Sequence, residues 1–424
     1  MRAVLGSVGV LLISAAILLA GGGLLSTLVA IRAKLEGFPL PAIGLMTSTY
    51  YAGFIAGCIY TPYLVKRVGH VRVFAALSAL TAAGTLIHVL AINIPIWILL
   101  RGVIGFSFAG LYLLIESWIN EAAPNEQRGQ VLSIYRMVDL AAVTAGQFML
   151  SMANPKDFVL FSVVALCICL AIFPISLSTA KAPQAVTETS LNLRKLVRVS
   201  PLASFGCFAV GLTNGAFWGV APIFVTDLGH SVFVVSIFMS VVIAAGAMLQ
   251  WPVGWLSDRL GRRQLILFIT IGGILAGIFL WLMGGKSRGM MLIGGAFYGF
   301  FALQVFGLCA AHANDRAEPH EFVAVSGGLL LIYGVGSVFG PILGALSMNN
   351  LGPEALFAYT AIIHTVLAIY TLYRLLRSDA PDDSADYIAV ARPRSMAIIR
   401  RMDPRIRRRK KTKNSKRSRV LPME

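Results

Sequence analysis

Twelve long apolar runs follow one another along the chain, and they constrain its fold more than any other feature. Each is long enough to cross about 30 Å of hydrocarbon as a helix. The first is longer than the apolar core of a secretory signal, so we expect it to remain a membrane helix. The predicted spans are residues 5–31, 41–65, 71–92, 96–119, 131–152, 157–178, 201–226, 231–255, 265–284, 289–312, 322–347 and 354–375. With 57% hydrophobic and 13% charged residues, the sequence predicts an all-α integral membrane protein.

The runs fall into two sets of six that resemble each other. FGPILG at 339–344 lies 194 positions after AGQFML, and Pro319 lies 195 positions after Pro124. A nearly constant offset indicates duplicated halves, which a pseudo-twofold axis should relate. We therefore predict four regions: an N-terminal six-helix bundle over 1–180, a cytoplasmic linker over 181–200, a C-terminal six-helix bundle over 201–377, and a basic, disordered cytoplasmic tail over 378–424.

Basic residues set the expected orientation, because cytoplasmic connections of membrane proteins are rich in Lys and Arg. If both termini are cytoplasmic, the outer connections contain only Arg32, Lys34, Lys156, Lys286 and Arg288. The net charge is +17, and 16 of the 36 Lys and Arg residues follow residue 373. Beside a membrane, such a tail favours binding to anionic lipid headgroups over binding to nucleic acid. We also expect a monomer.

The sequence contains no pattern typical of an enzyme, a metal site or a bound cofactor. The five cysteines all lie within apolar runs and lack metal-ligand or redox spacing. The segment GGKS at 284–287 is similar to the end of a phosphate-binding loop, but Leu280 stands where the first glycine is required. An ion gradient is therefore the expected source of energy for any transport.

Three segments carry a resemblance to a known family. GWLSDRLGRR (254–263), RGVIGFSFAG (101–110) and VGSVFGPILG (335–344) resemble the loop, fourth-helix and fifth-helix patterns of the major facilitator superfamily. QWPVGWLSDRLGRR and LIESWINEAA together look most like its YcaD-type branch, which implies an inner-membrane transporter without an established substrate. The first half departs from the family patterns at four positions: Pro62, Lys66, His70 and Gln147.

Charges at helix ends suggest a gate, since a secondary transporter rocks two bundles about a central site. We predict that Asp258 pairs with Arg128 and that Lys66 pairs with Glu321, each pair closing the cytoplasmic side. The alternative is that all four face cytoplasmic water. The predicted gate contains Lys66, Arg67, Arg72, Arg128, Asp258, Arg259, Arg262 and Glu321.

Three charged residues within the spans are candidates for proton coupling, because a charge inside the bilayer is costly. Arg101 could extend outward to the surface, whereas the family resemblance implies an inward-facing arginine that tunes a proton site or binds an anion. Glu116 could carry a proton or pair with Arg67 or Arg72. Asp139 could carry a proton or be neutralised by Arg136 on the same helical face.

A central cavity should hold the solute. We predict that it includes Tyr112, Asn214, Trp218, Tyr298 and Gln304, although any of these side chains could instead pack between helices. Aromatic and amide groups suit a neutral or cationic organic ligand. The expected function is a proton-coupled secondary transporter that exports a small organic solute; the alternatives are a uniporter or importer of a metabolite, or a sensor that transports nothing.

Overall fold

The computed structural model describes residues 2–122, 128–177, 193–257, 259–317 and 322–377. Within these ranges every regular element is a helix, as expected where no water can satisfy backbone groups. In the first half the helices are α1 (Arg2–Leu35), α2 (Leu40–Val68), α3 (His70–Leu90), α4 (Ile94–Ala122), α5 (Arg128–Met149) and α6 (Val159–Leu177). The others are α7 (Leu193–Val199), α8 (Pro201–Asp227), α9 (Val232–Ser257), α10 (Arg262–Met283), α11 (Arg288–Ala302), α12 (Val305–Asn314), α13 (Phe322–Leu351) and α14 (Ala355–Arg377).

The helices agree with the predicted spans in all but a few places. Ten regions of the described chain are long and apolar enough to cross a membrane. The other two predicted spans correspond to helices α5 and α6, which are not among these ten regions. The tenth predicted span is confirmed as one of these ten regions, Arg288–Asn314, in which a turn at Leu303 and Gln304 separates α11 from α12. The seven-residue helix α7 lies within the predicted linker.

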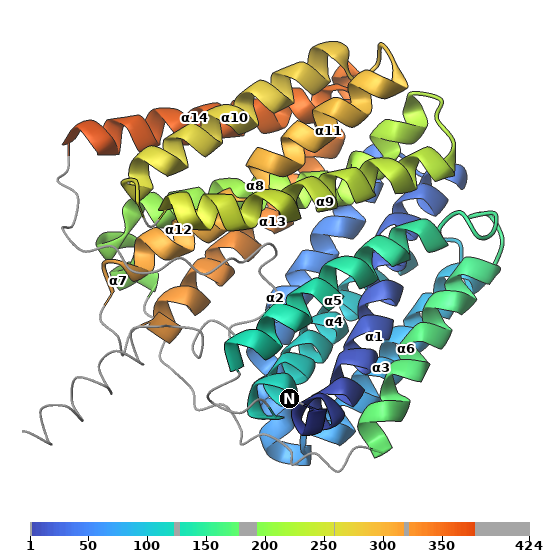
Figure 1. The fold of residues 1–424 in the computed structure, drawn as a ribbon. Helices are drawn as coiled ribbons and strands as arrows, with labels where there is room; N and C mark the ends of the chain where they lie inside the picture. Colours follow the sequence, from blue (N-terminus) through green and yellow to red (C-terminus); the bar gives the residue numbers. More distant parts are fainter. Residues whose placement is uncertain (1, 123–127, 178–192, 258, 318–321, 378–424) are drawn as a thin grey trace, which may run out of the picture.

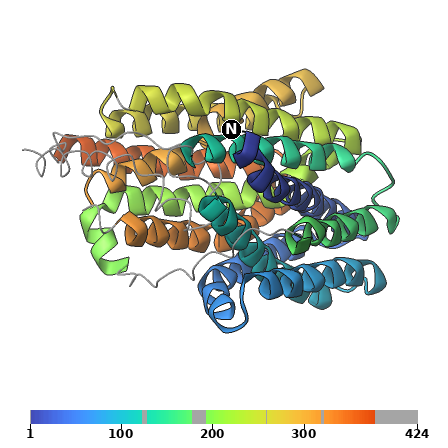
Figure 2. The same ribbon diagram turned by 60° about the horizontal axis from the view of Figure 1, so that its bottom comes forward.

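Both halves follow one packing scheme. In the first half α1 contacts α5 and α6, α2 contacts α4, and α3 contacts α6. In the second half α8 contacts α13 and α14, α9 contacts α11, and α10 contacts α14. Figures 1 and 2 show the two sets packed against each other, the first coloured blue to green and the second green to red. The shared scheme agrees with the duplication predicted from sequence.

Glycines allow several helix pairs to approach closely. A side chain at Gly53 or Gly57 of α2 would collide with backbone of Gly102 or Phe106 in α4. Gly299 of α11 meets the backbone of Val242 in α9 in the same way. Small residues at such crossings are typical of membrane helices, where packing replaces the hydrophobic effect.

Successive connections lie at opposite ends of the helices. We call the end where α1 ends and α2 begins the Lys34 end, and the opposite end the Lys66 end. At the Lys66 end Gly69, with φ of +87°, turns the chain between α2 and α3, a conformation that glycine adopts without steric cost.

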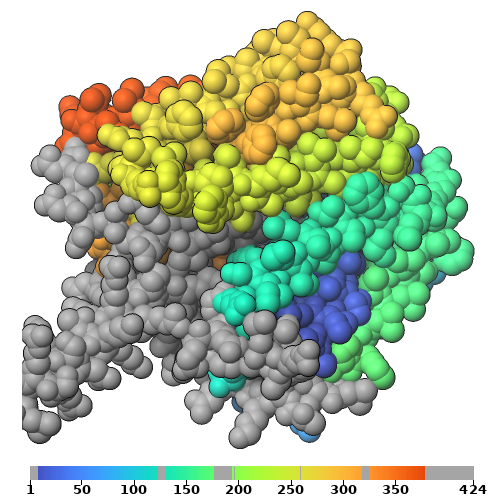
Figure 3. All heavy atoms as spheres, in the orientation of Figure 1, coloured from blue at the N-terminus to red at the C-terminus, as the bar shows by residue number. Residues whose placement is uncertain are grey.

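The two halves join at the Lys34 end and separate toward the Lys66 end. One apolar cluster runs through the first half and into the Lys34 end of the second, where it includes Phe217 and Met348. The Lys66 end of the second half has a separate cluster, which includes Leu202 and Phe306. Figure 3 shows α5 and α9 meeting on the surface, in teal and yellow-green. Among the described residues, the cores therefore merge only at the Lys34 end.

Candidate functional site

A cavity lies between the halves, near the middle of the helices. It contains about 150 Å³ of space for the centres of water-sized molecules. Helices α1, α2, α4 and α5 supply most of its wall, and α8 and α13 close it from the other half. Its lining residues are Gly22, Gly23, Leu25, Ser26, Thr47, Tyr50, Tyr51, Phe54, Ile55, Cys58, Arg101, Phe108, Tyr112, Val143, Gln147, Trp218, Leu330, Leu331, Tyr333 and Gly334. The wall is mostly apolar and aromatic, as in many sites for organic molecules.

Arg101 faces this cavity from α4. Arg101 is 4% exposed, and its guanidinium carbon lies 4.4 Å from the centre of the Tyr50 ring. Its Nε is buried and has no hydrogen-bond partner. Within the described part of the chain, no carboxylate lies within ion-pair distance of Arg101. The arginine therefore faces inward, and the outward-extended alternative is excluded in this structure.

Gln147 fixes the α5 side of the cavity. Thr27 Oγ1 donates to Gln147 Oε1 at 2.8 Å, and Gln147 Nε2 donates to the Gly23 carbonyl at 2.9 Å. Its own backbone carbonyl accepts a bond of 2.6 Å from Ser236 Oγ in α9. One residue thus joins α1, α5 and the second half. The side-chain amide fills the place where the family pattern has proline.

Two of the five predicted cavity residues, Tyr112 and Trp218, line this cavity. The other three lie in packed interior of the second half. Asn214 is 3% exposed, Tyr298 stacks on Phe217 with ring centres 5.0 Å apart, and Gln304 Nε2 donates to the Gly246 carbonyl at 2.7 Å. The Gln304 bond lies where the tenth span breaks. These three positions remain predictions for other states of the protein.

The predicted proton carriers are both buried. Asp139 is 3% exposed, and one of its carboxylate oxygens lies 3.8 Å from Nη1 of Arg136, so the predicted intrahelical pair is present. Glu116 is 1% exposed and lies within electrostatic reach of Cys58 in the cavity wall. Neither Arg67 nor Arg72, both exposed, forms an ion pair with Glu116 within the described residues. Their roles in coupling stay predictions.

Contacts between the halves at the Lys34 end were not predicted. Lys34 Nζ lies 3.1 Å and 3.2 Å from the two carboxylate oxygens of Asp227, at the ends of α1 and α8. Thr47 of α2 packs on Gly219 of α8 nearby. The ion pair could have been predicted from the sequence, because Lys34 and Asp227 have opposite charges and lie 193 positions apart, close to the repeat offset.

Among the residues that the structure describes, α2 becomes more exposed toward the Lys66 end, beyond its contact with α13. Ile55 packs against Gly334, but Ile59, one turn further on the same face of α2, is 52% exposed. Lys66, Arg67 and Arg72 are exposed at this end. Both predicted gate pairs lie outside the described residues, because Asp258, Glu321 and the side chain of Arg128 are not described. These pairs therefore remain predictions.

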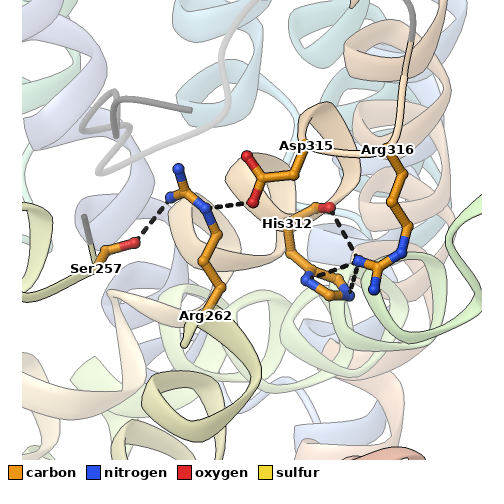
Figure 4. A network of polar contacts seen from close by, with 5 residues as sticks. All are labelled: Ser257, Arg262, His312, Asp315 and Arg316. Carbon is orange, nitrogen blue, oxygen red and sulfur yellow. Dashed lines mark hydrogen bonds and ion pairs between the residues drawn. The ribbon is translucent and has the colours of Figure 1, made fainter. Parts of the chain in front are cut away.

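The remaining predicted gate residues, Arg259 and Arg262, make contacts within the second half, and Figure 4 shows those of Arg262. Arg259 lies over Trp255, with 3.9 Å from its guanidinium carbon to the ring centre. Arg262 Nε lies 2.5 Å from a carboxylate oxygen of Asp315, and Arg262 Nη1 donates to Ser257 Oγ at 2.8 Å. Asp315 was not predicted. This pair joins the start of α10 to the end of α12, and so stabilises one bundle.

Arg316 extends the same network. Its Nη1 lies 2.6 Å from Nε2 of His312 and donates to the His312 carbonyl at 3.4 Å. Burial, reinforced by the charge of Arg263, lowers the pKa of Arg316 to about 10. Arg316 therefore stays positively charged near neutral pH. Among the described residues, no group of three His, Cys, Asp or Glu side chains is placed to bind a metal ion.

Comparison with known proteins identifies the family. A sequence model described as the Major Facilitator Superfamily matches residues 10–327 and again 203–405. The "Uncharacterized MFS-type transporter YcaD" of Salmonella arizonae is 28% identical over 369 residues, which cover 87% of this chain and 93% of the relative. The protein of the same name from Salmonella heidelberg is 27% identical with the same coverage. These matches confirm the resemblance seen in the sequence.

Solved structures of other transporters have the same fold as this chain. The nucleoside transporter NupG superposes with a TM-score of 0.73 at 14% identity, covering 88% of this chain and 99% of NupG. A bacterial homolog of the human lysosomal transporter Spinster, inward-facing and occupied, superposes with a TM-score of 0.72 at 15% identity, covering 87% and 96% of the two chains. At these identities the likeness concerns the fold alone. The chain is a multi-pass membrane protein and belongs to the major facilitator superfamily of transporters.

Proposed function

We propose that this transporter moves a small organic solute by alternating access, coupled to protons and in the export direction. The cavity between two halves that join at one end carries the proposal. A cavity closed at the Lys34 end can be exposed at the other side when the halves rock about it. An exporter would load its solute in the state with the Lys66 end open.

The Lys66 end is proposed to face the cytoplasm of the inner membrane, with both termini on that side. Support comes from the basic connections at this end, which contain Lys66, Arg67 and Arg72 between α2 and α3, and Arg259 and Arg262 between α9 and α10. The connections at the opposite end contain five basic residues in total. The tail is proposed to bind anionic lipid on the cytoplasmic side, and the protein to act as a monomer.

Transport in proteoliposomes tests the main proposal. Purified protein would be reconstituted with and without a pH gradient, and uptake measured across a solute panel. Saturable flux that depends on the gradient supports coupled transport, whereas gradient-independent flux indicates a uniporter. Gradient-driven flux in the opposite direction indicates an importer. If no solute shows saturable flux, the sensor alternative is favoured.

The gate proposal concerns the closed state of the Lys66 end. Asp258 with Arg128, and Lys66 with Glu321, are proposed to hold the two halves together there. Each pair is expected to contribute about 1 kcal/mol or less, as exposed pairs do, so that it breaks in every cycle. Lys66→Glu should slow transport, and Lys66→Glu with Glu321→Lys should restore it. Equal rates for the single and double variants would contradict the pairing.

A further inference from the structure

We infer that the cavity selects an organic anion with a flat apolar body, and that Arg101 binds its negative group. The inference rests on the proposed function, because it names the solute class of the same site. It replaces the sequence-based expectation of a neutral or cationic ligand. Four features of the cavity carry it: its charge, the position of Arg101, its aromatic wall and the use of its amide group.

The first feature is the charge of the cavity. Among the lining residues that the structure describes, Arg101 is the only charged one, and none is acidic. A guanidinium group remains protonated at physiological pH. A cationic solute would therefore meet an uncompensated positive charge, while an anion would neutralise it. Buried charges are found paired, since an isolated one is strongly disfavoured.

The second feature is the position of Arg101. The Tyr50 ring supports the guanidinium from one side at 4.4 Å, which limits the orientations of the group. Its Nε is buried without a hydrogen-bond partner, and the residue borders the cavity. Because the Nε itself is buried, the Nη groups at the end of the side chain are the donors proposed for a ligand. A planar guanidinium also matches the geometry of a carboxylate.

The third feature is the aromatic wall. Phe108 and Tyr112 pack with ring centres 5.4 Å apart, and Phe54 lies 6.4 Å from Tyr112. Trp218 from α8 borders the same space. Such rings favour a flat apolar body by stacking or edge contacts. The ligand should therefore combine an apolar ring with one negative group.

The fourth feature, the use of the amide group, indicates that the ligand carries a single negative charge. Gln147, the only amide side chain in the lining, already binds Thr27 and Gly23 through its oxygen and its nitrogen. Its oxygen and one of its two N–H groups are therefore used in holding α1 to α5. Arg101 is the one charged group of the described lining, which suits a monoanion.

A matched ligand series on the full-length purified protein tests the charge preference. Benzoate, benzamide and benzylamine share one ring and differ in charge. We would measure equilibrium binding and the shift in unfolding temperature for each, with sodium chloride at equal ionic strength as a further arm. Benzoate should bind and raise the unfolding temperature, and the other two compounds should do so at least about ten-fold more weakly.

Variants then assign the effect to Arg101. Arg101→Gln should weaken benzoate binding about ten-fold or more, and Arg101→Lys should keep part of it. Arg377→Gln is the matched control, because Arg377 also lies over a tyrosine ring, Tyr373 at 5.0 Å, but on the exposed end of α14. It should bind benzoate like the natural protein. The ligand series on the natural protein needs no variant, so it decides the matter even if Arg101→Gln does not fold.

Several results would overturn the inference. These are no binding of benzoate, equal or tighter binding of benzamide or benzylamine, an equal effect of chloride alone, or unchanged benzoate binding in Arg101→Gln. Flux measurements separate this failure from that of the proposed function. Anion binding without flux of any solute contradicts transport and leaves the anion site intact. Flux of a neutral or cationic solute that does not depend on Arg101 contradicts the anion site and leaves transport intact.

Discussion

Arg262 and Asp315 form an ion pair whose side chains are 2% and 5% exposed. Removal of one partner leaves a buried charge without compensation, which costs about 3 to 5 kcal/mol. Arg262→Gln should therefore lower the free energy of unfolding by about that amount, measured by denaturant titration in mixed micelles. Arg262→Gln with Asp315→Asn should recover much of the loss. Arg259→Gln, on the exposed surface over Trp255, should change it by about 0.5 kcal/mol or less.

A loss in Arg262→Gln no greater than in Arg259→Gln would show that the pair is not a stabilising contact. In that case Arg262 would be available for the gate. The measurement thus separates the two roles of this residue.

Asp139 is the residue at which proton coupling can be tested most directly. Asp139→Asn should abolish gradient-driven flux of the transported solute and preserve its gradient-independent exchange, because an amide cannot carry the proton. Since Arg136 lies 3.8 Å away, the variant should also lose some stability, and Arg136→Gln with Asp139→Asn should restore it without restoring coupling. Asp157→Asn, in an exposed connection, is the matched control.

If the double variant regains gradient-driven flux, Asp139 acts only as the partner of Arg136. Flux in proteoliposomes and unfolding in detergent therefore report on the two roles separately.

The sequence indicated which individual residues were candidates for a site, but it did not indicate which side chains they contact. A charge at position 101 within an apolar run has to face protein or extend to the surface, so Arg101 could be singled out from sequence. Its cavity could not, because the side chains around it come from α2, α5, α8 and α13. Asn214, Tyr298 and Gln304 show the same limit, since a polar residue on a membrane helix can line a cavity or pack inside a bundle.

The close packing of α2 against α4 depends on glycines at the contact between them. A methyl group at Gly105 would collide with the backbone of Tyr50, which cannot move without separating the helices. Gly105→Ala should lower the unfolding temperature and displace Tyr50 from Arg101. Gly9→Ala is the control, because nothing lies within 4 Å of its added methyl group. It should be neutral or raise stability by up to about 1 kcal/mol.

Equal unfolding temperatures for the two alanine variants would contradict this account of the α2 and α4 contact. A loss in Gly105→Ala alone supports it.

The extent of each helix was largely predictable, since hydrocarbon thickness sets the length of a span. The break in the helix at Leu303 could not be predicted, because neither proline nor glycine stands at Leu303 or Gln304. It coincides with the bond from Gln304 to Gly246 in another helix. A tertiary contact of this kind leaves no periodic signal in the local sequence.

The two halves are held at the Lys34 end in part by Lys34 and Asp227. These side chains are 38% and 21% exposed, so the pair is worth about 1 kcal/mol or less. Lys34→Ala should shift the population toward the state open at that end by up to about five-fold. Labelling of a single introduced cysteine near Thr47 by a membrane-impermeant thiol reagent would measure this shift. Lys34→Asp with Asp227→Lys should return labelling to the original level, whereas Lys286→Ala, at the same end, should not change it.

The repeat offset that reveals the duplication also places Lys34 and Asp227 at corresponding positions of the two halves. In a symmetric dimer of one six-helix ancestor, a residue on the twofold axis would face its own copy. Two lysines or two aspartates would repel each other there. An attractive pair on the axis is therefore possible only after the two copies acquired separate sequences. The contact between Lys34 and Asp227 therefore depends on that divergence, and two identical subunits could not have formed it.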